Sequence, residues 1–312
     1  MSNFEPILLT GCTASGKSEL AKNLSKLTPS VIINADALQV YDCWKILTAR
    51  PTEIDVKNSH HALYGHISYL KNYDVAKWLT ELKSELSNAK EKNLRPIIVG
   101  GTGLYFTMLV NGISKIPSIS ELTRQKANQI MKTNPSQFTN DLKTWDKNSY
   151  GKLDPDNYVR LQRAWEVCYE TGETLLYWQS KSLPPLLNFK STKSIILSCK
   201  SSYLEKNIKT RFKKMLAMGL TNEVAFAVNR LPSKVDELAA FRAIGVKEII
   251  SYLKGELSLV EVESLMTTKT RQYAKRQRTW FRSKFYDWKT TNIDEGTDLM
   301  KTAQDIDNMK IN

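Results

Sequence analysis

A glycine-rich segment near the start of the chain carries the residues best suited to chemistry. Its members are Gly11, Cys12, Thr13, Ala14, Ser15, Gly16, Lys17 and Ser18. An apolar run precedes them and a helical pattern follows, which is the strand, turn and helix order of a phosphate-binding loop. Glycines let successive N–H groups point inward, and the helix N-terminus adds partial positive charge. We expect Lys17 to reach a terminal phosphate and the Ser18 hydroxyl to ligate Mg²⁺.

Asp36 is a second candidate, at the end of the apolar run 31–35. Ordinary phosphate-loop ATPases use a strand-end Asp to help hold Mg²⁺, but here the run 96–99 ends in Gly100-Gly101-Thr102-Gly103, without a carboxylate. Asp36 can therefore serve Mg²⁺, cap the next helix or act as a base. The carboxyl ends of parallel strands line a ligand crevice, so each role places Asp36 near the phosphates and makes Thr102 a candidate substrate contact.

The segment 270–282 is strongly basic. At helical spacing four basic side chains share one face, and three aromatic residues lie on the opposite half. The basic residues are Arg271, Lys275, Arg278 and Arg282, and positions 271–286 contain no carboxylate. A face of one charge sign favours contact with the phosphates of a nucleic acid. A second basic cluster lies at 206–214 and includes Arg211.

The composition agrees with a polyanionic partner. The 312 residues include 45 basic and 32 acidic ones, a formal charge of +13, which suits nucleic acid, although a merely basic enzyme stays open. No apolar run is long enough to span a membrane, and the first strand begins too early for a signal peptide. The four scattered cysteines indicate reduced thiols. We expect a cytoplasmic monomer.

Four apolar segments predict parallel strands, at 7–10, 31–35, 96–100 and 194–199. Helical patterns at 20–27 and 75–90 separate the first three. This alternation predicts an α/β fold, a P-loop NTPase-like parallel sheet flanked by helices.

Helical patterns without strands follow at 117–131, 135–145 and 156–171, the last with Asp154 as N-cap and Gly172 at its end. We expect a helical insertion domain at 115–191, within a catalytic core formed by 1–114 and 192–312. The core continues with helices predicted at 203–218, 221–229, 237–250, 258–265 and 267–285, and the polar tail after Thr290 is expected to fray.

Together these residues resemble the tRNA dimethylallyltransferases (tRNA isopentenyltransferases) of the bacterial type, over about the first 290 residues. The segments that carry the resemblance are Gly11–Ser18, Asn34–Tyr41, Ala49–Thr52, Gly100–Phe106, Asp154–Val167, Arg211–Val224, Ala243–Gly245 and Lys269–Arg282. The resemblance implies transfer of a dimethylallyl group from dimethylallyl diphosphate to N6 of the adenosine immediately 3′ of the anticodon, position 37, in tRNAs that read codons starting with U. It implies Mg²⁺ as cofactor, the tRNA anticodon stem-loop as partner, and a channel that the flipped adenine and the diphosphate enter from opposite sides.

The resemblance also implies residue roles. Lys17 and Arg211 would neutralise the diphosphate leaving group, and Thr13 would bond one of its oxygens. Asp36 would accept the N6 proton, and Thr102 would contact the transferring centre or the tRNA. Contacts to tRNA are implied for Asp36, Ala37, Leu38, Gln39, Thr102, Arg124, Tyr158, Val159, Arg160, Leu161, Gln162, Arg242, Ala243, Ile244, Gly245, Val246 and Lys247.

The chain departs from the family pattern at three places, one of which is Val246, where an aromatic residue is common. Cys12 stands where the family usually has Pro, and the stretch 42–48 lacks the family's Arg and glycines.

Two other functions stay open. One is prenylation of a free adenine nucleotide, against which the insertion and the basic helix argue. The other is a small-molecule P-loop kinase or an NTP-driven RNA-binding switch, against which the missing strand-end carboxylate argues.

Overall fold

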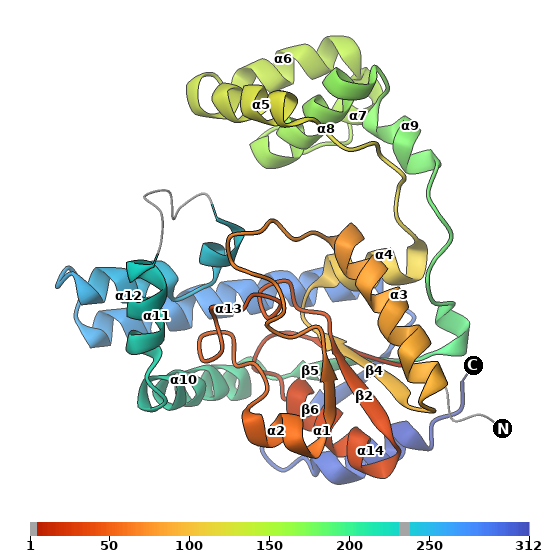
Figure 1. Ribbon diagram of the computed structural model, residues 1–312, viewed down its shortest axis with the longest axis vertical. Coiled ribbons are helices and arrows are strands. Elements are labelled where there is room, and N and C mark those ends of the chain that lie inside the picture. The colour runs from red at the N-terminus through yellow and green to blue at the C-terminus, as the bar shows by residue number, and fades with distance from the viewer. Residues whose placement is uncertain (1–4, 231–237, 312) are drawn as a thin grey trace. The chain divides into compact units, whose positions relative to one another are not determined.

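The computed structural model describes residues 5–230 and 238–311, and its core is a six-stranded parallel sheet (Figure 1). The strands are β1 (Ile7–Gly11), β2 (Ser30–Asn34), β3 (His60–Ala62), β4 (Arg95–Gly100), β5 (Lys193–Cys199) and β6 (Lys289–Ile293), in the order β3-β2-β4-β1-β5-β6. The predicted α/β fold is confirmed. All four predicted strands are present, but β3 and β6 were missed because these short edge strands lack an apolar run.

The sheet brings the predicted chemistry to one edge. β1 pairs with β4 on one side and β5 on the other, with Thr10 opposite Gly100 and Gly11 opposite Leu197. β2 pairs with the far side of β4. Since all these pairs are parallel, the segments that follow β1, β2 and β4 leave the sheet at the same edge.

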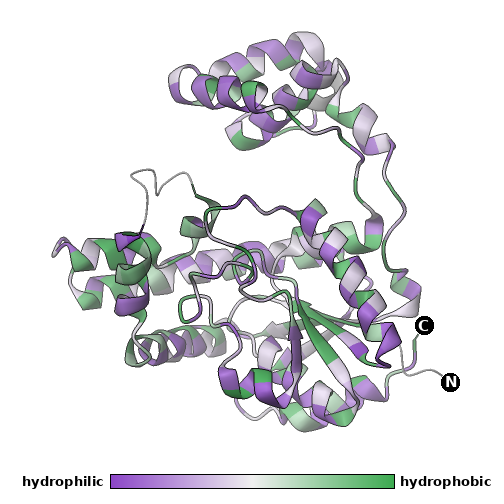
Figure 2. Cartoon of the chain, in the orientation of Figure 1, coloured by the Kyte–Doolittle hydropathy of each residue, from purple (hydrophilic) through white to green (hydrophobic). Residues whose placement is uncertain are grey.

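Helices cover both faces of the sheet, and successive strand residues alternate between them. Ile7 and Leu9 pack with α1 (Lys17–Leu27) and α14 (Leu299–Asp307). Leu8 packs on the other face with α3 (Val75–Glu91), α4 (Gly103–Asn111) and α13 (Leu259–Lys284). The helices are striped purple and green in Figure 2, as burial of one helix face requires.

A second hydrophobic cluster lies beside the sheet. It joins α10 (Ser201–Ala217), α11 (Leu220–Asn229), η3 (Ala239–Arg242), α12 (Val246–Leu253) and α13 to the segment 38–47. Trp44 is wholly buried there and its indole N–H donates to the Ala240 carbonyl at 2.8 Å. The Glu223 carboxylate accepts the N–H groups of three successive residues, Lys45, Ile46 and Leu47, at 2.7–2.8 Å. The unusual stretch 42–48 is therefore a packed, hydrogen-bonded part of the core.

Two helix predictions in this region need correction. The helix predicted at 237–250 begins only at Val246, because Gly245 has φ +107°, a left-handed conformation that interrupts the helix. Glu237 itself lies outside the described residues. The helices predicted at 258–265 and 267–285 are the single helix α13, in which Met266 and Thr267 are buried.

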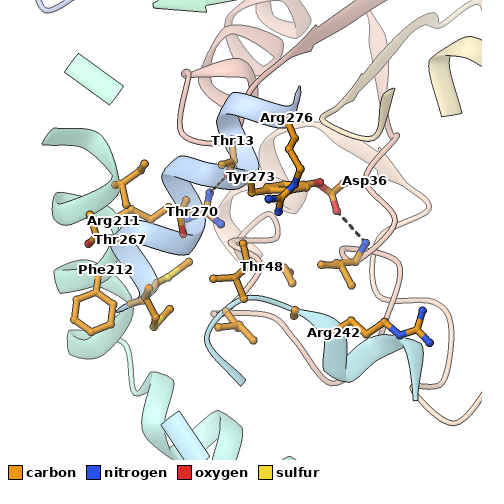
Figure 3. Close-up of a pocket in the computed structure, with 17 residues that line it drawn as sticks. Thr13, Asp36, Thr48, Arg211, Phe212, Arg242, Thr267, Thr270, Tyr273 and Arg276 are labelled. Carbon is orange, nitrogen blue, oxygen red and sulfur yellow. Dashed lines mark hydrogen bonds between the residues drawn. The ribbon is translucent and has the colours of Figure 1, made fainter. Parts of the chain in front are cut away.

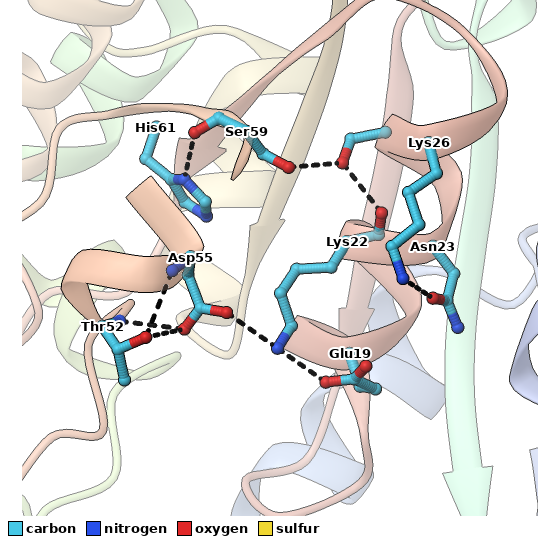
Figure 4. Close-up of polar contacts among 9 residues, drawn as sticks. Glu19, Lys22, Asn23, Lys26, Thr52, Asp55, Ser59 and His61 are labelled. Atoms are coloured by element: carbon cyan, nitrogen blue, oxygen red, sulfur yellow. Dashed lines mark hydrogen bonds and ion pairs between the residues drawn. The ribbon is translucent and has the colours of Figure 1, made fainter. Parts of the chain in front are cut away.

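The short helix α2 (Glu53–Asn58) buries no side chain and is held by polar contacts instead (Figure 4). Thr52 and Asp55 form a capping box at its start. Asp55 also accepts from Lys22 of α1 at 3.0 Å, and Ser59 contacts Ser25 of α1 at 3.0 Å. These contacts attach the segment 52–59 to the helix that follows the glycine-rich loop.

Residues 111–185 form a separate compact unit with its own core, and residues 1–110 with 186–312 form the other; the sequence placed these junctions at 114/115 and 191/192. The smaller unit contains α5 (Glu121–Thr133), α6 (Ser136–Trp145), α7 (Lys147–Tyr150), α8 (Tyr158–Thr171) and α9 (Leu175–Ser180). Phe138 and Trp165 lie at its centre. Asn157, and not Asp154, caps α8, while Gly172 ends that helix with φ +70° as predicted.

The chain after Thr290 does not fray as expected. The tail first pairs with β5 as β6 and then forms α14. Before β5, the chain forms a short 3-10 helix, η1 (Phe189–Ser191). Ile293, Ala303 and Ile306 are buried with α1 and the central strands. Among residues 5–230 and 238–311 there is no helix of sufficient length and apolarity to cross a membrane.

We therefore predict that Ile306→Ala lowers the free energy of unfolding by about 2–4 kcal/mol, as for other buried large-to-small substitutions. Gln304→Ala is the control, because Gln304 is exposed on the same helix. Chemical denaturation monitored by circular dichroism measures both. Equal stability of the two variants would show that the tail is not part of the core.

Candidate functional site

The glycine-rich loop connects β1 to α1 in the form predicted from the sequence. Gly11 has φ +150°, and a Cβ there would lie 2.5 Å from the Leu197 carbonyl oxygen, so strand pairing demands glycine. Gly16 has φ +93° and precedes α1, and Ala14 also has a positive φ, of 60°. These turns curl the backbone into the concave shape that binds anions through N–H groups.

Two cations face this loop. Lys17 donates from Nζ to the Cys12 carbonyl at 2.6 Å, and Arg211 of α10 donates from Nη1 to Thr13 Oγ1 at 3.4 Å. Burial lowers the pKa of Lys17 to about 8 and also lowers the pKa of Arg211, while the nearby Asp36 carboxylate opposes both shifts. Buried positive charge of this kind is stabilised by an anion in the loop.

Gln277 of α13 bridges the two loops at the sheet edge. Its side-chain oxygen accepts the Thr13 N–H at 2.8 Å, and its amide nitrogen donates to the Gly101 carbonyl at 2.8 Å. The side chain is 5% exposed, so these two backbone groups fix its orientation. Gln277 therefore holds the phosphate loop at a set distance from the loop after β4.

The same helix explains the glycines that follow β4. A Cβ on Gly101 would lie 2.4 Å from Gln277 Nε2, and one on Gly103 would lie 2.3 Å from Trp280 Cδ1. A Cβ on Gly100 would lie 2.1 Å from the Ala35 carbonyl oxygen. Glycine is thus required at these three positions, because α13 and the end of β2 approach the backbone there too closely for a Cβ.

Asp36 follows β2 and is anchored by backbone donors. Its Oδ1 accepts the N–H groups of Leu38 at 2.9 Å and Gln39 at 3.4 Å, and its own N–H donates to Asn34 Oδ1 at 2.9 Å. Figure 3 shows the first of these bonds and the Tyr273 ring beside Asp36. Burial raises the pKa of Tyr273, and the Asp36 charge raises it further. Oδ2 has no hydrogen-bond partner among the described residues.

Thr102 lies next to Asp36, as the sequence placed it. Its Oγ1 accepts the Ala37 N–H at 2.9 Å, and its backbone N–H donates to the Ala35 carbonyl at 3.3 Å. The hydroxyl proton is left available for another acceptor. Thr102 therefore fixes the turn that carries Asp36 and keeps one donor for a ligand.

Two cavities share the residues Thr13, Asp36, Thr48, Arg211 and Met215. The larger, of about 740 Å³, lies over the glycine-rich loop and includes Lys17, Ser18, Arg50 and Lys214. The smaller, of about 320 Å³, is lined by apolar side chains and by Arg242, Thr270 and Arg276 (Figure 3). The cavity over the glycine-rich loop and the smaller cavity thus have Asp36 and Arg211 in common.

The donors at the larger cavity fit a magnesium ion. The exposed Ser18 at the start of α1 lines this cavity, as do Asp36 and the loop. Mg²⁺ prefers hard oxygen ligands and often takes only one or two from the protein, the rest coming from phosphates and water. Within the described parts of the chain, no group of three or more His, Cys, Asp or Glu side chains could hold a metal by itself. Ser18 and Asp36 are thus the side-chain oxygens at this cavity that could join phosphate oxygens and water around an ion.

The expected tRNA contacts in the larger unit are only partly accessible. Ala37, Leu38 and Gln39 are half-buried beside Asp36, and Leu38 lines the smaller cavity. Arg242 and Lys247 are exposed and Ile244 is half-buried, whereas Ala243, Gly245 and Val246 are buried. The side chains of Ala243 and Val246 are buried and Gly245 has none, so a contact of these three residues with tRNA stays a prediction for their backbone groups.

The remaining expected contacts lie in the smaller unit. Arg124 is exposed on α5, and Tyr158, Val159 and Arg160 are exposed in the first turn of α8. Gln162 is half-buried and donates to Asn128 Oδ1 at 2.9 Å. Leu161 is 0% exposed within the unit's core, so the expectation that its side chain contacts tRNA is wrong.

The basic face predicted at 270–282 lies on α13, but its four cations differ in their exposure and in their partners. Arg271 forms an ion pair with Glu205 at 3.3 Å, and Arg278 is half-buried and donates to Ser201 Oγ at 3.3 Å. Lys275 and Arg282 are exposed and have no acidic partner among the described residues. The segment contains no carboxylate, yet α10 supplies one, which sequence spacing along one helix cannot reveal.

Several site residues were not identified from the sequence. Gln277 was missed because its partners lie 264 and 176 positions away. Asn207 donates to the Ala14 carbonyl at 3.1 Å and was hidden within a helical pattern. The motif Thr270–Arg282 contained Gln277, so the resemblance could have indicated it.

Comparisons with known proteins agree with this geometry. The model of the IPP transferase family matches residues 39–284. The tRNA dimethylallyltransferase of Ruegeria sp. (strain TM1040) is 41% identical over 284 residues, covering 91% of this chain and 94% of that one. The enzyme of the same name from Dinoroseobacter shibae is 41% identical over 288 residues, covering 92% and 95%.

Solved structures are also similar. A tRNA delta(2)-isopentenylpyrophosphate transferase from Staphylococcus epidermidis has a TM-score of 0.65 at 27% identity, covering 97% of each chain. A eukaryotic dimethylallyltransferase acting on tRNA has a TM-score of 0.79 at 26% identity, covering 92% of this chain and 73% of that one. Family match, sequence identity and fold all confirm the resemblance, and the chain belongs to the IPP transferase family.

Proposed function

We propose that this chain is a tRNA dimethylallyltransferase, which transfers a dimethylallyl group from dimethylallyl diphosphate to N6 of adenosine 37 in tRNAs that read codons starting with U. The observation that carries the proposal is the sharing of Asp36 and Arg211 by a cavity over the glycine-rich loop and a second, smaller cavity. Relatives that share 41% of their residues over nine tenths of this chain are named for this activity.

The donor's diphosphate binds at the loop 11–18. The loop supplies backbone N–H groups and the α1 N-terminus, and Lys17 and Arg211 face it from two sides. As the bond from carbon to the bridging oxygen breaks, negative charge grows on the diphosphate. The two cations stabilise that charge more than they stabilise the bound donor, which is the condition for catalysis.

The adenine amine is held by Asp36. Leu38 and Gln39 hold Oδ1 through their N–H groups, so the carboxylate keeps one orientation and presents Oδ2 to the cavities. The N6 lone pair bonds to the prenyl carbon, and Oδ2 accepts the N6 proton. Thr102 positions the Asp36 turn and offers its hydroxyl to the reacting groups.

Ser18 would hold Mg²⁺ together with diphosphate oxygens. When bound, the ion supplies charge neutralisation of the leaving diphosphate. The transfer itself needs no strand-end carboxylate after β4, because no water is activated and no nucleotide is hydrolysed. This explains how Gly100 and Gly101 can occupy the place that an ATPase gives to Asp.

We propose that the anticodon stem-loop contacts both units. Exposed groups are available on α13, on the segment around Arg242, and on α5 and α8 of the smaller unit. N6 of a stacked adenine is out of reach, so the base must leave the stack and enter the smaller cavity. We propose a monomer that acts in the cytoplasm, where unmodified tRNA is present.

The two alternatives are less favoured. A free-nucleotide prenyltransferase has no use for exposed cations on two separate units, and relatives at this identity are named for tRNA. A P-loop kinase or an NTP-driven switch ordinarily has a strand-end carboxylate that helps hold Mg²⁺, whereas glycines are fixed by close packing at the end of β4. Nucleoside analysis of tRNA from cells lacking this protein tests the choice: the N6-(dimethylallyl)adenosine family must disappear, and its persistence would contradict the proposal.

Asp36→Asn should lower kcat for transfer by about 10²–10⁴-fold, because the amide cannot accept the N6 proton. Its oxygen still accepts from Leu38 and Gln39, so the fold and tRNA affinity should stay within about threefold of wild type. Transfer of labelled prenyl groups and a filter-binding assay measure the two effects. Asp305→Asn is the control, because Asp305 is exposed on α14. Parallel loss of activity and tRNA affinity would assign Asp36 a structural role instead.

Gln277→Met should weaken binding of inorganic pyrophosphate with Mg²⁺ by about tenfold, because two hydrogen bonds worth about 1 kcal/mol each no longer hold the loop. Gln277→Glu should lose at least as much affinity, since it cannot donate to Gly101 and its negative charge repels the anion. Titration calorimetry measures the affinities, with exposed Gln272→Met as control. Unchanged affinity in Gln277→Met would show that the two hydrogen bonds of Gln277 do not support pyrophosphate binding.

Changing both Lys275 and Arg282 to Gln should weaken tRNA binding. The slope of log affinity against log salt should flatten by about 0.7–0.9 per lost phosphate contact. Arg271→Gln should change the slope less, because Glu205 already offsets that charge at 3.3 Å. Binding titrations at several salt concentrations provide the measurement. A double variant with the wild-type slope would show that this face does not meet the RNA backbone.

A further inference from the structure

Arg50 is a cation at the larger cavity that the proposed mechanism does not use. It lines this cavity together with Lys17 and Ser18. It also lines an adjoining side cavity of about 190 Å³, which shares Ser18 and Tyr64 with the larger one. Arg50 and Ser18, the latter in the first turn of α1, therefore belong to the part of the wall that both cavities have in common.

The protein satisfies the guanidinium of Arg50 only in part. Nη2 donates to the Asp42 carbonyl at 3.2 Å, whereas Nε is buried and has no hydrogen-bond partner among the described residues. A guanidinium carries several N–H donors, and a buried donor without a partner costs free energy. The remaining donors of Arg50 therefore favour an acceptor that a ligand supplies.

The charge of Arg50 also lacks a partner, because no carboxylate within residues 5–230 and 238–311 forms an ion pair with it. Asp55, which lines the side cavity, accepts from Lys22 at 3.0 Å instead (Figure 4). The Glu223 carboxylate is taken up by three backbone N–H groups. Burial lowers the pKa of Arg50, and the charge of Glu223 opposes this shift. A half-buried cation in this state is stabilised by an added anion.

The backbone around Arg50 leaves a defined place for its side chain. Gly65 has φ +58°, and a Cβ there would overlap Arg50 Nη1, so the glycine leaves the space that the guanidinium occupies. Ala49 has φ +50°, a left-handed conformation that is costly for a residue with a Cβ. Gln39 holds that turn by donating from Nε2 to the Thr48 carbonyl at 2.8 Å. Strained turns that their surroundings hold in this way cluster at functional sites.

The position of Arg50 distinguishes the two phosphates of a bound donor. The phosphate that carries the prenyl carbon must lie near Asp36, since the carbon has to reach the amine held there. Asp36 and Arg211 line both the larger and the smaller cavity, whereas Arg50 lines the larger one but not the smaller one. Arg50 is therefore on the side of the larger cavity that is remote from the reacting carbon.

We propose that Arg50 is a diphosphate-binding residue, whose guanidinium donates to the terminal phosphate of the prenyl donor and of the pyrophosphate product. This inference rests on the function proposed above, which places the donor's diphosphate in the larger cavity. A planar guanidinium donates two parallel N–H groups to one phosphate, whereas an ammonium acts as a point charge. Arg50 thus orients the leaving group from its far end, while Lys17 and Arg211 face the loop itself.

Titration calorimetry with the full chain and inorganic pyrophosphate with Mg²⁺ tests this inference. Arg50→Gln should weaken binding by about 10- to 100-fold, as expected for the loss of a hydrogen bond to a charged group. Arg50→Lys should recover only part of the affinity, because it restores the charge but not the paired donors. Lys57→Gln is the control, since it removes the same charge from an exposed position of α2 outside both cavities.

Dimethylallyl monophosphate tests which phosphate Arg50 meets, because this ligand lacks the terminal group. Its affinity should be the same in Arg50→Gln and in the wild type. The melting temperature of unliganded Arg50→Gln should not fall, because Nε has no partner to lose. The rise in melting temperature that pyrophosphate causes should be smaller in the variant than in the wild type. If Arg50→Gln does not fold, Arg50→Lys takes its place in both ligand titrations.

The inference is overturned if Arg50→Gln binds pyrophosphate as tightly as Lys57→Gln does. It is also overturned if the variant binds both ligands more weakly to the same extent, or if its only defect is a lower melting temperature without ligand. Prenyl transfer to tRNA is measured separately. Transfer by a chain whose pyrophosphate affinity does not depend on Arg50 contradicts this inference alone. Pyrophosphate binding that depends on Arg50, in a chain that does not prenylate tRNA, supports the diphosphate site and contradicts only the proposed function.

Discussion

The close approach of α13 to the carboxyl edge of the sheet is the constraint on which the rest of the site depends. Gln277 joins the Thr13 N–H to the Gly101 carbonyl, and Gly101 and Gly103 are glycines because Gln277 and Trp280 leave no room for a Cβ. The helix that carries the exposed cations Lys275 and Arg282 is therefore fixed to the phosphate loop. The basic face of α13 and the glycine-rich loop form one hydrogen-bonded assembly, which is the preorganisation that electrostatic catalysis requires.

Within that assembly the charges are arranged for a leaving group rather than for a hydrolysed nucleotide. Lys17 and Arg211 face the loop, and Asp36 lines both the cavity over the loop and the smaller cavity. A carboxylate held by the Leu38 and Gln39 N–H groups is suited to orient an amine and accept its proton. The energy for the reaction then comes from the donor's own diphosphate. The family membership of the chain agrees with this division of roles.

Much of this could be predicted from the sequence where the signal is local. The loop 11–18, the four buried strands and the Gly172 helix end follow from spacing over a few residues. What was missed depends on contacts between distant segments. Gln277 acts on residues 264 and 176 positions away, Glu205 neutralises Arg271 from another helix, and the polar tail folds because β5 offers it an edge. Leu161 looked like a contact residue, but only its place in the core of the smaller unit shows that it is buried.

Transfer of labelled prenyl groups from dimethylallyl diphosphate tests the central claim most directly, with unmodified tRNA and free AMP, ADP and ATP offered as separate acceptors. The account predicts label on N6 of one adenosine of the tRNA anticodon loop, release of one pyrophosphate per adduct, and no label on free nucleotide. Label on free nucleotide but not on tRNA would contradict it, as would RNA-stimulated ATP hydrolysis without any tRNA adduct.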